Sequence, residues 1–394
     1  MPYKNYTEEL LGLKDIIITN VKQNEKCCNI YIEMPRKVHT CPSCGCGTDQ
    51  IHDYRNQRIK DISAYGRYTI LHLRKRRYTC PVCNKHFYES IPFLPKYHRL
   101  TNRLSAWIVN EFRKVHSMSD IAERNNVSGT TAARIFDNIN YPKPSLTETL
   151  SFDEFRGNAD GEKFQFIMTD PKNKRVLDIL PTRKAEDLYG YFSQFSDKNK
   201  VKYVVIDMSK DYRYLAHTCF PQATLVADKY HVVRQTIWAF ENVRKQEQQR
   251  FGDSRRKYFK RSRKLLLKRP ENLSEMEKEQ VAAMLSVSDR LRYAYALKNE
   301  FFKVMDSKDS LEARKRLGVW NMMAQGYRNE LPEFTGCFNT YTNWQKEILN
   351  SFNCPYTNGY TEGVNNKIKV LKRNAFGVRN FERFRNRILH IMAA

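Results

Sequence analysis

Two pairs of cysteines constrain the fold of this chain more than any other feature of its sequence. Both follow the pattern Cys-x-x-Cys, and their members are Cys41, Cys44, Cys80 and Cys83. Each pair can present two thiolates to one metal ion, and four thiolates leave no coordination position open for a substrate. We therefore expect a structural Zn²⁺ ion inside a small β-rich module. Alternative ligands lie near the pairs in the sequence: Cys46, His52 and His86.

The charge balance of the chain indicates a polyanionic partner. Its 394 residues include 68 Lys and Arg against 43 Asp and Glu, a formal net charge of +25, which is more than solubility requires. This length exceeds the ~250–300 residues at which one core usually divides, so we expect two or three domains. The sequence shows no run of about 18 apolar residues and no signal-peptide pattern. We therefore expect a cytoplasmic protein, and its positive charge favours association with a polyanion such as DNA.

A helix-turn-helix is predicted at residues 99–140, directly after the zinc-binding β-rich module at residues 1–98. The segment contains a first helix, a turn at Asn125 and Asn126, and a second helix capped by Ser128. Asn tolerates the left-handed backbone conformation that such a turn requires. An ordinary helical hairpin is the alternative. In a DNA-binding motif, one exposed face of the second helix would enter the major groove, and its residues are Ser128, Thr130, Thr131 and Arg134.

The pattern changes class after a Pro-containing linker at residues 141–149. Alternating or buried apolar segments predict strands at 150–155, 163–169, 174–180, 201–206 and 224–227, with helices at 186–195 and 212–220. This order predicts an α/β sheet that begins with antiparallel strands. Beyond it, residues 232–345 show long helical periodicity and no strand pattern. Three tryptophans there are expected in core positions, with stacking on an unpaired base as the alternative: Trp238, Trp320 and Trp344.

Three carboxylates are expected to converge at the predicted sheet. Asp153 lies midway along the first strand, where a carboxylate is costly unless it is paired or bound to a cation. Asp207 follows the strand at 201–206, at the edge where α/β sheets usually build sites. Glu362 begins a helical pattern that would pack across the sheet. Together they form a ligand set for two Mg²⁺ (or Mn²⁺) ions, which promote in-line attack on a phosphodiester.

Asp228 is the alternative to Asp207 as the second metal ligand, because it directly follows the fifth predicted strand. We favour Asp207, which ends the strand expected to adjoin the first. His231 lies three residues after Asp228. Its imidazole is suited to orient a phosphate, to protonate a leaving oxygen or to satisfy a buried hydrogen bond.

The segment that carries Glu362 is strongly basic. Residues 358–394 contain eight Lys or Arg against two Glu. A solvated basic helix is one interpretation, and a helix that holds DNA beside bound metal ions is the other. With two aspartates expected on adjacent strands, we favour DNA binding by the cations that follow Glu362: Lys367, Lys369, Lys372 and Arg373.

Several motifs occur in one order along the chain: CPSC…CPVC, the helix-turn-helix, SFDEF, VVIDMSKDYR, ADKYHVVR and NGYTEGVNNKIKVLKR. In this order they resemble the transposases of the IS-L-three insertion-sequence family. The resemblance implies a multidomain α+β protein with an RNase H-like catalytic domain of the DDE type at residues 150–231 and 346–394, interrupted by an all-helical insertion at 232–345. It also implies that Asp153, Asp207 and Glu362 are the catalytic triad, with Asp228 and His231 as an accessory motif.

The activity implied by this resemblance is DNA transposition. The zinc module and helix-turn-helix would bind the terminal inverted repeats, and metal-dependent hydrolysis at the element ends would be followed by attack of a 3′-hydroxyl on target DNA. Because two ends must meet, a homodimer or higher assembly on DNA is expected. The alternatives are a catalytically inactive zinc and helix-turn-helix regulator, and a nuclease that cleaves without joining.

Overall fold

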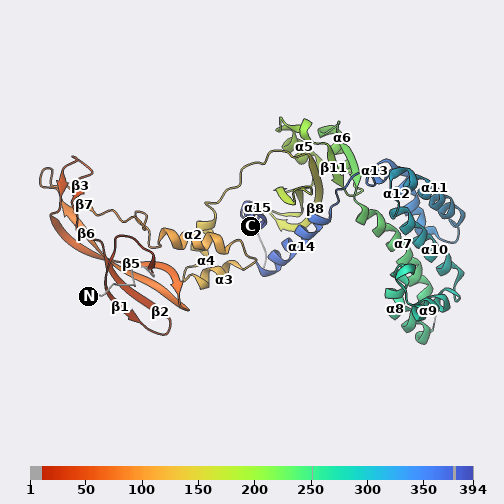
Figure 1. The fold of residues 1–394 in the computed structure, drawn as a ribbon, viewed down its shortest axis with the longest axis horizontal. Helices are drawn as coiled ribbons and strands as arrows, with labels where there is room; N and C mark the ends of the chain where they lie inside the picture. Colours follow the sequence, from red (N-terminus) through yellow and green to blue (C-terminus); the bar gives the residue numbers. More distant parts are fainter. Residues whose placement is uncertain (1–10, 251, 376–378, 394) are drawn as a thin grey trace. The chain divides into compact units, whose positions relative to one another are not determined.

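The computed structural model describes residues 11–250, 252–375 and 379–393 (Figure 1). The chain divides into two compact units, the first made of residues 1–141 and 369–394 and the second of residues 142–368. None of the described helices is both long enough and apolar enough to cross a membrane.

A β-sheet opens the first unit. Its strands and two short pairing strands are β1 (Ile17–Gln23), β2 (Cys27–Glu33), β3 (His39–Thr40), β4 (Gly47–Thr48), β5 (Ile51–Ala64), β6 (Arg67–Thr79) and β7 (His86–Tyr88). The sheet order is β1-β2-β6-β5, with β7 also paired to β6. The long β5–β6 hairpin turns at Tyr65 and Gly66, with φ of 53° and 74°, because a two-residue turn requires positive φ. Ile32, Ile59 and Leu71 are buried in the core of this sheet.

Three helices follow the sheet in the first unit: α2 (Asn102–Glu111), α3 (Met118–Arg124) and α4 (Gly129–Phe136). The side chain of Ser128 caps α4 by accepting a hydrogen bond from the backbone N–H of Thr131. Asn126, in the turn before it, has φ of 52°. Both features were expected of a helix-turn-helix, and they confirm that prediction. Phe112 and Phe136 stack in its core with ring centroids 4.4 Å apart.

The last helix, α15 (Phe381–Met392), packs against the helices of the first unit. His390 Nε2 lies 2.9 Å from a backbone carbonyl oxygen of α2, and Arg383 pairs with the carboxylate that follows α4 at 2.7 Å. The sequence groups residues 346–394 with the catalytic domain, whereas residues 369–394 belong to the first unit. A hydrophobic pattern predicts that a helix is covered but not which partner covers it, and that is the reason for the difference.

A five-stranded sheet organises the second unit. Its strands are β8 (Thr149–Ala159), β9 (Glu162–Asp170), β10 (Arg175–Leu180), β11 (Tyr203–Ile206) and β12 (Thr224–Ala227). The order across the sheet is β10-β9-β8-β11-β12. Neighbours are antiparallel as far as β8 and parallel from β8 to β12. This arrangement confirms the predicted α/β sheet that begins with antiparallel strands, and it places β8 at the centre, next to β11.

Helices cover both faces of this sheet. α5 (Ala185–Ser193) and α6 (Lys210–Cys219) bury one face, where Phe152 of β8 packs with Phe192 and Tyr212 at centroid distances of 5.3 and 6.4 Å. The opposite face meets segments from much later in the chain.

The second face of the sheet is covered by α13 (Gln345–Asn350) and the start of α14 (Gly359–Asn374). Asn350 Nδ2 donates to the carbonyl oxygen of Leu225 on β12 at 2.8 Å, and Val205 of β11 packs with Cys354. Chain segments about 150 residues apart in the sequence therefore pack against each other on this face of the sheet.

The described residues between β12 and α14 form helices and no strand, in agreement with the predicted helical pattern. α7 (Lys229–Gln249) begins two residues after β12 and extends from the sheet into this region (Figure 1). It is followed by α8 (Asp253–Leu267), α9 (Glu275–Leu285), α10 (Asp289–Met305), α11 (Ser310–Gly326) and α12 (Thr335–Asn343). Short 3-10 helices lie at 270–272 and 332–334 in this region, and another lies at 198–200, before β11.

Two of the three tryptophans occupy the core positions that the sequence predicts. Trp320 and Trp344 are 0% and 2% exposed. Trp238 is 54% exposed, with the guanidinium carbon of Arg234 4.1 Å from its ring centroid. The prediction of a core position is wrong for Trp238 because this side of α7 has no covering helix among the described residues. The alternative, stacking on an unpaired base, stays open for it.

Candidate functional site

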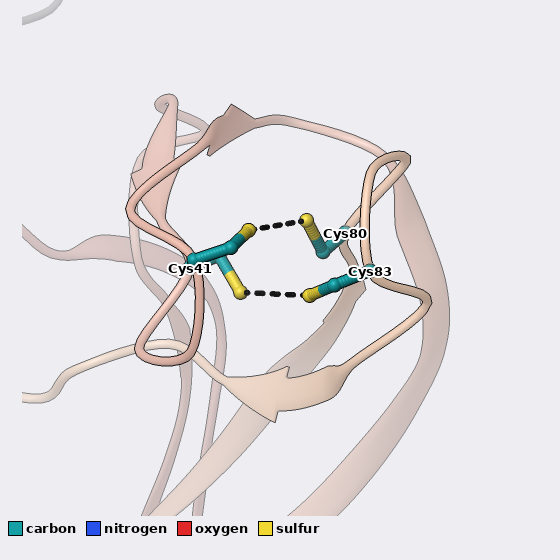
Figure 2. Close-up of side chains that lie close together, drawn as sticks. Cys41, Cys80 and Cys83 are labelled. Atoms are coloured by element: carbon teal, nitrogen blue, oxygen red, sulfur yellow. Dashed lines mark hydrogen bonds between the residues drawn. The ribbon is translucent and has the colours of Figure 1, made fainter.

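The two cysteine pairs meet in the first unit. Cys41 Sγ lies 3.6 Å from Cys83 Sγ, and Cys44 Sγ lies 3.4 Å from Cys80 Sγ. All four sulfurs lie within 4.8 Å of one another, and Figure 2 shows the labelled side chains pointing toward a common centre. Tetrahedral zinc with bonds of about 2.3 Å separates its sulfurs by about 3.8 Å. The group therefore fits a structural zinc ion.

The backbone of both cysteine pairs favours the thiolate form of the first cysteine. A hydrogen bond from the backbone N–H of Cys44 lowers the pKa of Cys41, and one from Cys83 lowers the pKa of Cys80 to about 6. Because zinc binds the thiolate, these N–H groups prepare the pairs for the metal.

The three alternative zinc ligands lie outside this group. Cys46 Sγ contacts the carbonyl oxygen of Gly47 at 3.4 Å. His52 and His86 stack on each other with centroids 4.2 Å apart, and His86 Nδ1 lies 3.0 Å from the hydroxyl of Thr79. Among the described residues, the group with zinc-type ligands in this module consists of the four predicted cysteines.

The residues of α4 that are predicted to face DNA divide between two hollows of the first unit. Ser128, Thr131 and Arg134 line a groove of about 1400 Å³, whereas Thr130 lines a separate hollow of about 470 Å³. Thr130 and Arg134 are four residues apart and are therefore neighbours on the helix surface, and Thr130 is exposed. That all four residues face DNA stays a prediction.

Three neighbouring strands bring aspartates to one region of the second unit. Asp153 lies on β8, Asp207 directly follows β11, and Asp228 directly follows β12. Since β8, β11 and β12 are adjacent and parallel, these positions lie along one part of the sheet. Asp207 ends the strand that adjoins β8, as predicted. Asp153 is 8% exposed, and its Oδ1 accepts a hydrogen bond from the backbone N–H of Glu154 at 2.8 Å.

The start of α14 carries Glu362 to the same face of the sheet. Thr361 Oγ1 lies 2.9 Å from Ser151 Oγ and 2.7 Å from Thr169 Oγ1, and these hydroxyls are buried. Ser151 and Asp153 are two residues apart on β8 and therefore point to the same face. The buried hydroxyl contacts fix the first turn of α14 over that face.

Asp228, His231 and Glu362 form a second group with metal-binding geometry. Each offers one ligand atom, and these atoms lie within 4.8 Å of one another. Asp228 Oδ2 is 4.0 Å from His231 Nε2, and Asp228 Oδ1 accepts a hydrogen bond at 3.3 Å from the backbone N–H of Asn358, just before α14. Asp207 lies outside this group, so the choice between Asp207 and Asp228 stays open.

Burial raises the pKa of all three aspartates. The pKa of Asp153 rises to about 6, and those of Asp207 and Asp228 also rise, while His231 opposes the shift in each case. Desolvation disfavours the charged form of a carboxylate, so a cluster that is ionised at neutral pH calls for a cation. Asp228 Oδ2 is also buried without a hydrogen-bond partner among the described residues.

Asn365 belongs to this site although no sequence pattern pointed to it. Its side chain is buried, and its Nδ2 donates to Asp153 Oδ2 at 2.9 Å. Its Oδ1 is buried without a hydrogen-bond partner in the described part of the chain. Asn365 lies three residues after Glu362, so both project from one side of α14. The spacing Glu-x-x-Asn is the signal from which it could have been found.

The predicted DNA-holding cations lie along α14 beyond Glu362. Lys367 is exposed and belongs to the second unit, five residues after Glu362. The other three lie on the part of α14 that belongs to the first unit, and they are Lys369, Lys372 and Arg373. Lys369 and Arg373 are exposed and Lys372 is half-buried.

Three family models match successive parts of this chain. The zinc-finger of transposase IS204/IS1001/IS1096/IS1165 matches residues 37–83, and the helix-turn-helix domain of transposase family ISL3 matches residues 89–140. A model of the same family, described as transposase, matches residues 150–388. These segments contain the four cysteines, the helix-turn-helix and the carboxylate site. Together they define a DNA-binding transposase.

The names of two similar proteins agree with these matches. The chain is 28% identical over 373 residues to the transposase for insertion sequence element IS1001 of Bordetella parapertussis, covering 90% of this chain and 89% of that one. It is 30% identical over 129 residues to the transposase for IS1557 of Mycobacterium tuberculosis, covering 33% of this chain and 28% of that one. A Lactococcus lactis protein named ATP-dependent protease is 34% identical over 113 residues, covering 29% and 34%. The chain belongs to the ISL3 transposase family.

Proposed function

We propose that the second unit catalyses metal-dependent DNA cleavage and strand transfer at the ends of an insertion sequence. The observation that supports this most strongly is the placement of aspartates on or directly after the neighbouring strands β8, β11 and β12, with the first turn of α14 held against β8 through Thr361 and Asn365. In this proposal Asp153, Asp207 and Glu362 are the catalytic triad. The strand order supports an RNase H-like domain, with the helices from α7 to α12 as its insertion.

The residues at this site fit hard divalent cations such as Mg²⁺ or Mn²⁺, which prefer carboxylate and amide oxygens. Two buried oxygens without hydrogen-bond partners among the described residues, Asp228 Oδ2 and Asn365 Oδ1, support this fit. When bound, the cations would activate a water or a 3′-hydroxyl and stabilise the leaving oxygen of a phosphodiester.

The protein groups around the triad have separate roles in this proposal. Asn365 orients the Asp153 carboxylate through its hydrogen bond to Oδ2. Asp228 holds the start of α14 through the backbone N–H of Asn358. We assign the second metal-ligand position of the triad to Asp207 because it ends the strand next to β8, and Asp228, whose Oδ2 lies in the group with His231 and Glu362, is its rival. His231 is suited to orient a phosphate or to donate a proton to the leaving oxygen.

The catalytic proposal is tested by Glu362→Gln, which keeps the shape of the side chain and removes its charge. We expect normal binding to DNA that carries the element ends and at least about a hundredfold slower nicking and joining with Mg²⁺. Glu382→Gln, an exposed acid at the start of α15, is the matched control. Wild-type nicking by the Glu362 variant would exclude the triad.

The assignment of Asp207 over Asp228 has its own test. We expect Asp207→Asn to abolish nicking at every Mn²⁺ concentration. Asp228→Asn retains an oxygen that can accept from the Asn358 N–H, so we expect it to nick when Mn²⁺ is raised. The reverse pattern in the two variants would exchange their roles.

The remaining parts of the proposal concern DNA and assembly. The zinc module and helix-turn-helix would bind the terminal inverted repeats, and the basic residues of α14 would hold DNA near the metal site. A homodimer or higher assembly would join two ends. Strand-transfer products distinguish this enzyme from a nuclease that only cleaves, and nicking of either strand distinguishes it from an inactive regulator.

A further inference from the structure

A groove of about 1400 Å³ lies between the β-sheet and α4 of the first unit. Its walls come from β5, from the loop before α2 and from the face of α4 that carries Ser128, Thr131 and Arg134. Of the described residues that line it, none is an Asp or Glu, although the chain has 43 acidic residues. The groove therefore carries basic side chains on both walls and no acidic one among the described residues that line it.

Hydrogen bonds fix the two walls of the groove relative to each other. The backbone N–H of Lys60 donates to the carbonyl oxygen of Arg99 at 2.9 Å, and the backbone N–H of Thr101 donates to the carbonyl oxygen of Lys60 at 3.1 Å. The loop before α2 therefore pairs with β5. Lys60 Nζ donates to the carbonyl oxygen of Asn126 in the helix-turn-helix turn. Ser63 Oγ donates to the carbonyl oxygen of Arg124, the last residue of α3, at 3.2 Å. The sheet and the helix-turn-helix thus form one preorganised surface.

Three arginines of the groove are available to a ligand. Arg58, Arg99 and Arg134 are exposed, and none forms an ion pair with a carboxylate within the described ranges. In contrast, the nearby Arg124 pairs with Asp120 at 3.0 Å. Exposed guanidinium groups without a carboxylate partner, gathered around a preformed groove, match the charge and the oxygen acceptors of a phosphate backbone.

We propose that this groove, rather than α4 alone, is the binding site for duplex DNA. Ser128, Thr131 and Arg134 read base edges from the α4 wall. Arg58 and Arg99 on the opposite wall bind the sugar–phosphate backbone that borders the same major groove. Arg58 and Arg99 lie outside the cysteine pairs and outside the helices of the helix-turn-helix. The inference rests on the proposed binding of the element ends by the first unit.

The test compares two double variants of the full chain. One is Arg58→Ala with Arg99→Ala. Its matched control is Arg55→Ala with Lys22→Ala, which removes two exposed cations of the same sheet outside the groove. Binding to duplexes with an element end and to random duplexes is measured between about 50 and 200 mM salt. Zinc content and circular dichroism establish that both variants are folded.

We expect the groove variant to bind both duplexes about tenfold more weakly and to lower the slope of log K against log salt by about two. Its preference for the element end should not change, whereas Arg134→Ala should reduce that preference. A groove variant that behaves like its control overturns the proposal. If the groove variant lowers the salt slope but the unchanged chain shows no preference for element ends, end recognition fails while the binding of the DNA backbone by the groove is upheld.

Discussion

Asn365 links the helix that carries Glu362 to the strand that carries Asp153. One end of its amide donates to Asp153 Oδ2, and the other end is buried without a hydrogen-bond partner among the described residues. A buried amide oxygen in this state costs free energy unless something binds it. We infer that Asn365 positions the first aspartate for the metal and contributes to the affinity of the site.

At this scale we expect Asn365→Ala to raise the Mg²⁺ concentration needed for half-maximal nicking by about ten- to a hundredfold, as loss of residues that orient metal ligands usually does. The melting-temperature increase produced by Mn²⁺ should fall in parallel. Asn366→Ala is the matched control, since Asn366 is the next residue and is exposed. Equal metal dependence of the two variants would remove Asn365 from the site.

Among elements, the first Cys-x-x-Cys turn lies between β3 and β4, and the second lies between the end of the long β6 and β7. β3 and β4 are two residues each, and β7 is three. Such short strands are marginal alone, so the four thiolates and their zinc ion must provide much of the stability at this end of the sheet.

We therefore expect Cys41→Ser to lower the zinc content and the binding of element ends together. Cys46→Ser should retain both, because Cys46 lies outside the group that could hold the metal. Metal analysis and a DNA-binding titration on the same preparations measure the two effects. Full zinc content in the Cys41 variant would contradict the four-cysteine site.

In the helical region, a buried lysine joins two helices. Lys298 of α10 donates to the carbonyl oxygens of Leu266 and Lys268 at the end of α8, at 2.8 and 3.3 Å. Burial lowers the pKa of Lys298 to about 7. Between about pH 7 and 10.5 the Lys298 side chain is protonated in the unfolded chain and neutral in the folded chain. The free energy of unfolding therefore rises with pH across this range, and this gain is lost as the pH falls through about 7.

The free energy of unfolding is expected to change by on the order of 2–5 kcal/mol between pH 7 and 10.5 because of Lys298. Lys298→Met should remove it, so that the difference between variant and wild type changes with pH. Lys303→Met, at an exposed position of the same helix, should not. Thermal unfolding followed by tryptophan fluorescence measures this, with Trp320 as a local reporter because it donates to the carbonyl oxygen of Leu297.

Across the molecule, the zinc group and the carboxylate site lie in different compact units. If zinc is removed by a chelator and Mg²⁺ is then restored, we expect the protein to lose its preference for element ends but to retain Mg²⁺-dependent nicking of DNA without selectivity. Competition with random DNA measures the first effect and plasmid relaxation the second. Loss of all nicking with intact second-unit structure would contradict this separation.

Parts of the fold that depend on local spacing were predictable from the sequence. The cysteine pairs, the Asn126 turn with its Ser128 cap, and the strands of the second unit follow from residue type and periodicity. The position of Asp207 beside β8 followed from its place at the end of a strand. In these cases the physical cause acts over a few residues.

Features that depend on partners far away in the chain were not predictable in this way. Periodicity did not distinguish exposed Trp238 from buried Trp320, because each lies in a helix and only packing decides which side is covered. It also gave no sign of Asn365, whose place at the site depends on its hydrogen bond to Asp153, more than 200 residues away in the chain.

By itself the sequence determined the two cysteine pairs, the helix-turn-helix, the succession of strands along the chain and the candidate acids, since each rests on residue type and short spacing. Only the tertiary structure decided which acids lie together, that α14 joins β8 through buried hydroxyls, and that β5 and α4 enclose one groove. These results require contacts between residues tens to hundreds of positions apart, and side-chain burial and hydrogen bonding in the folded chain select them.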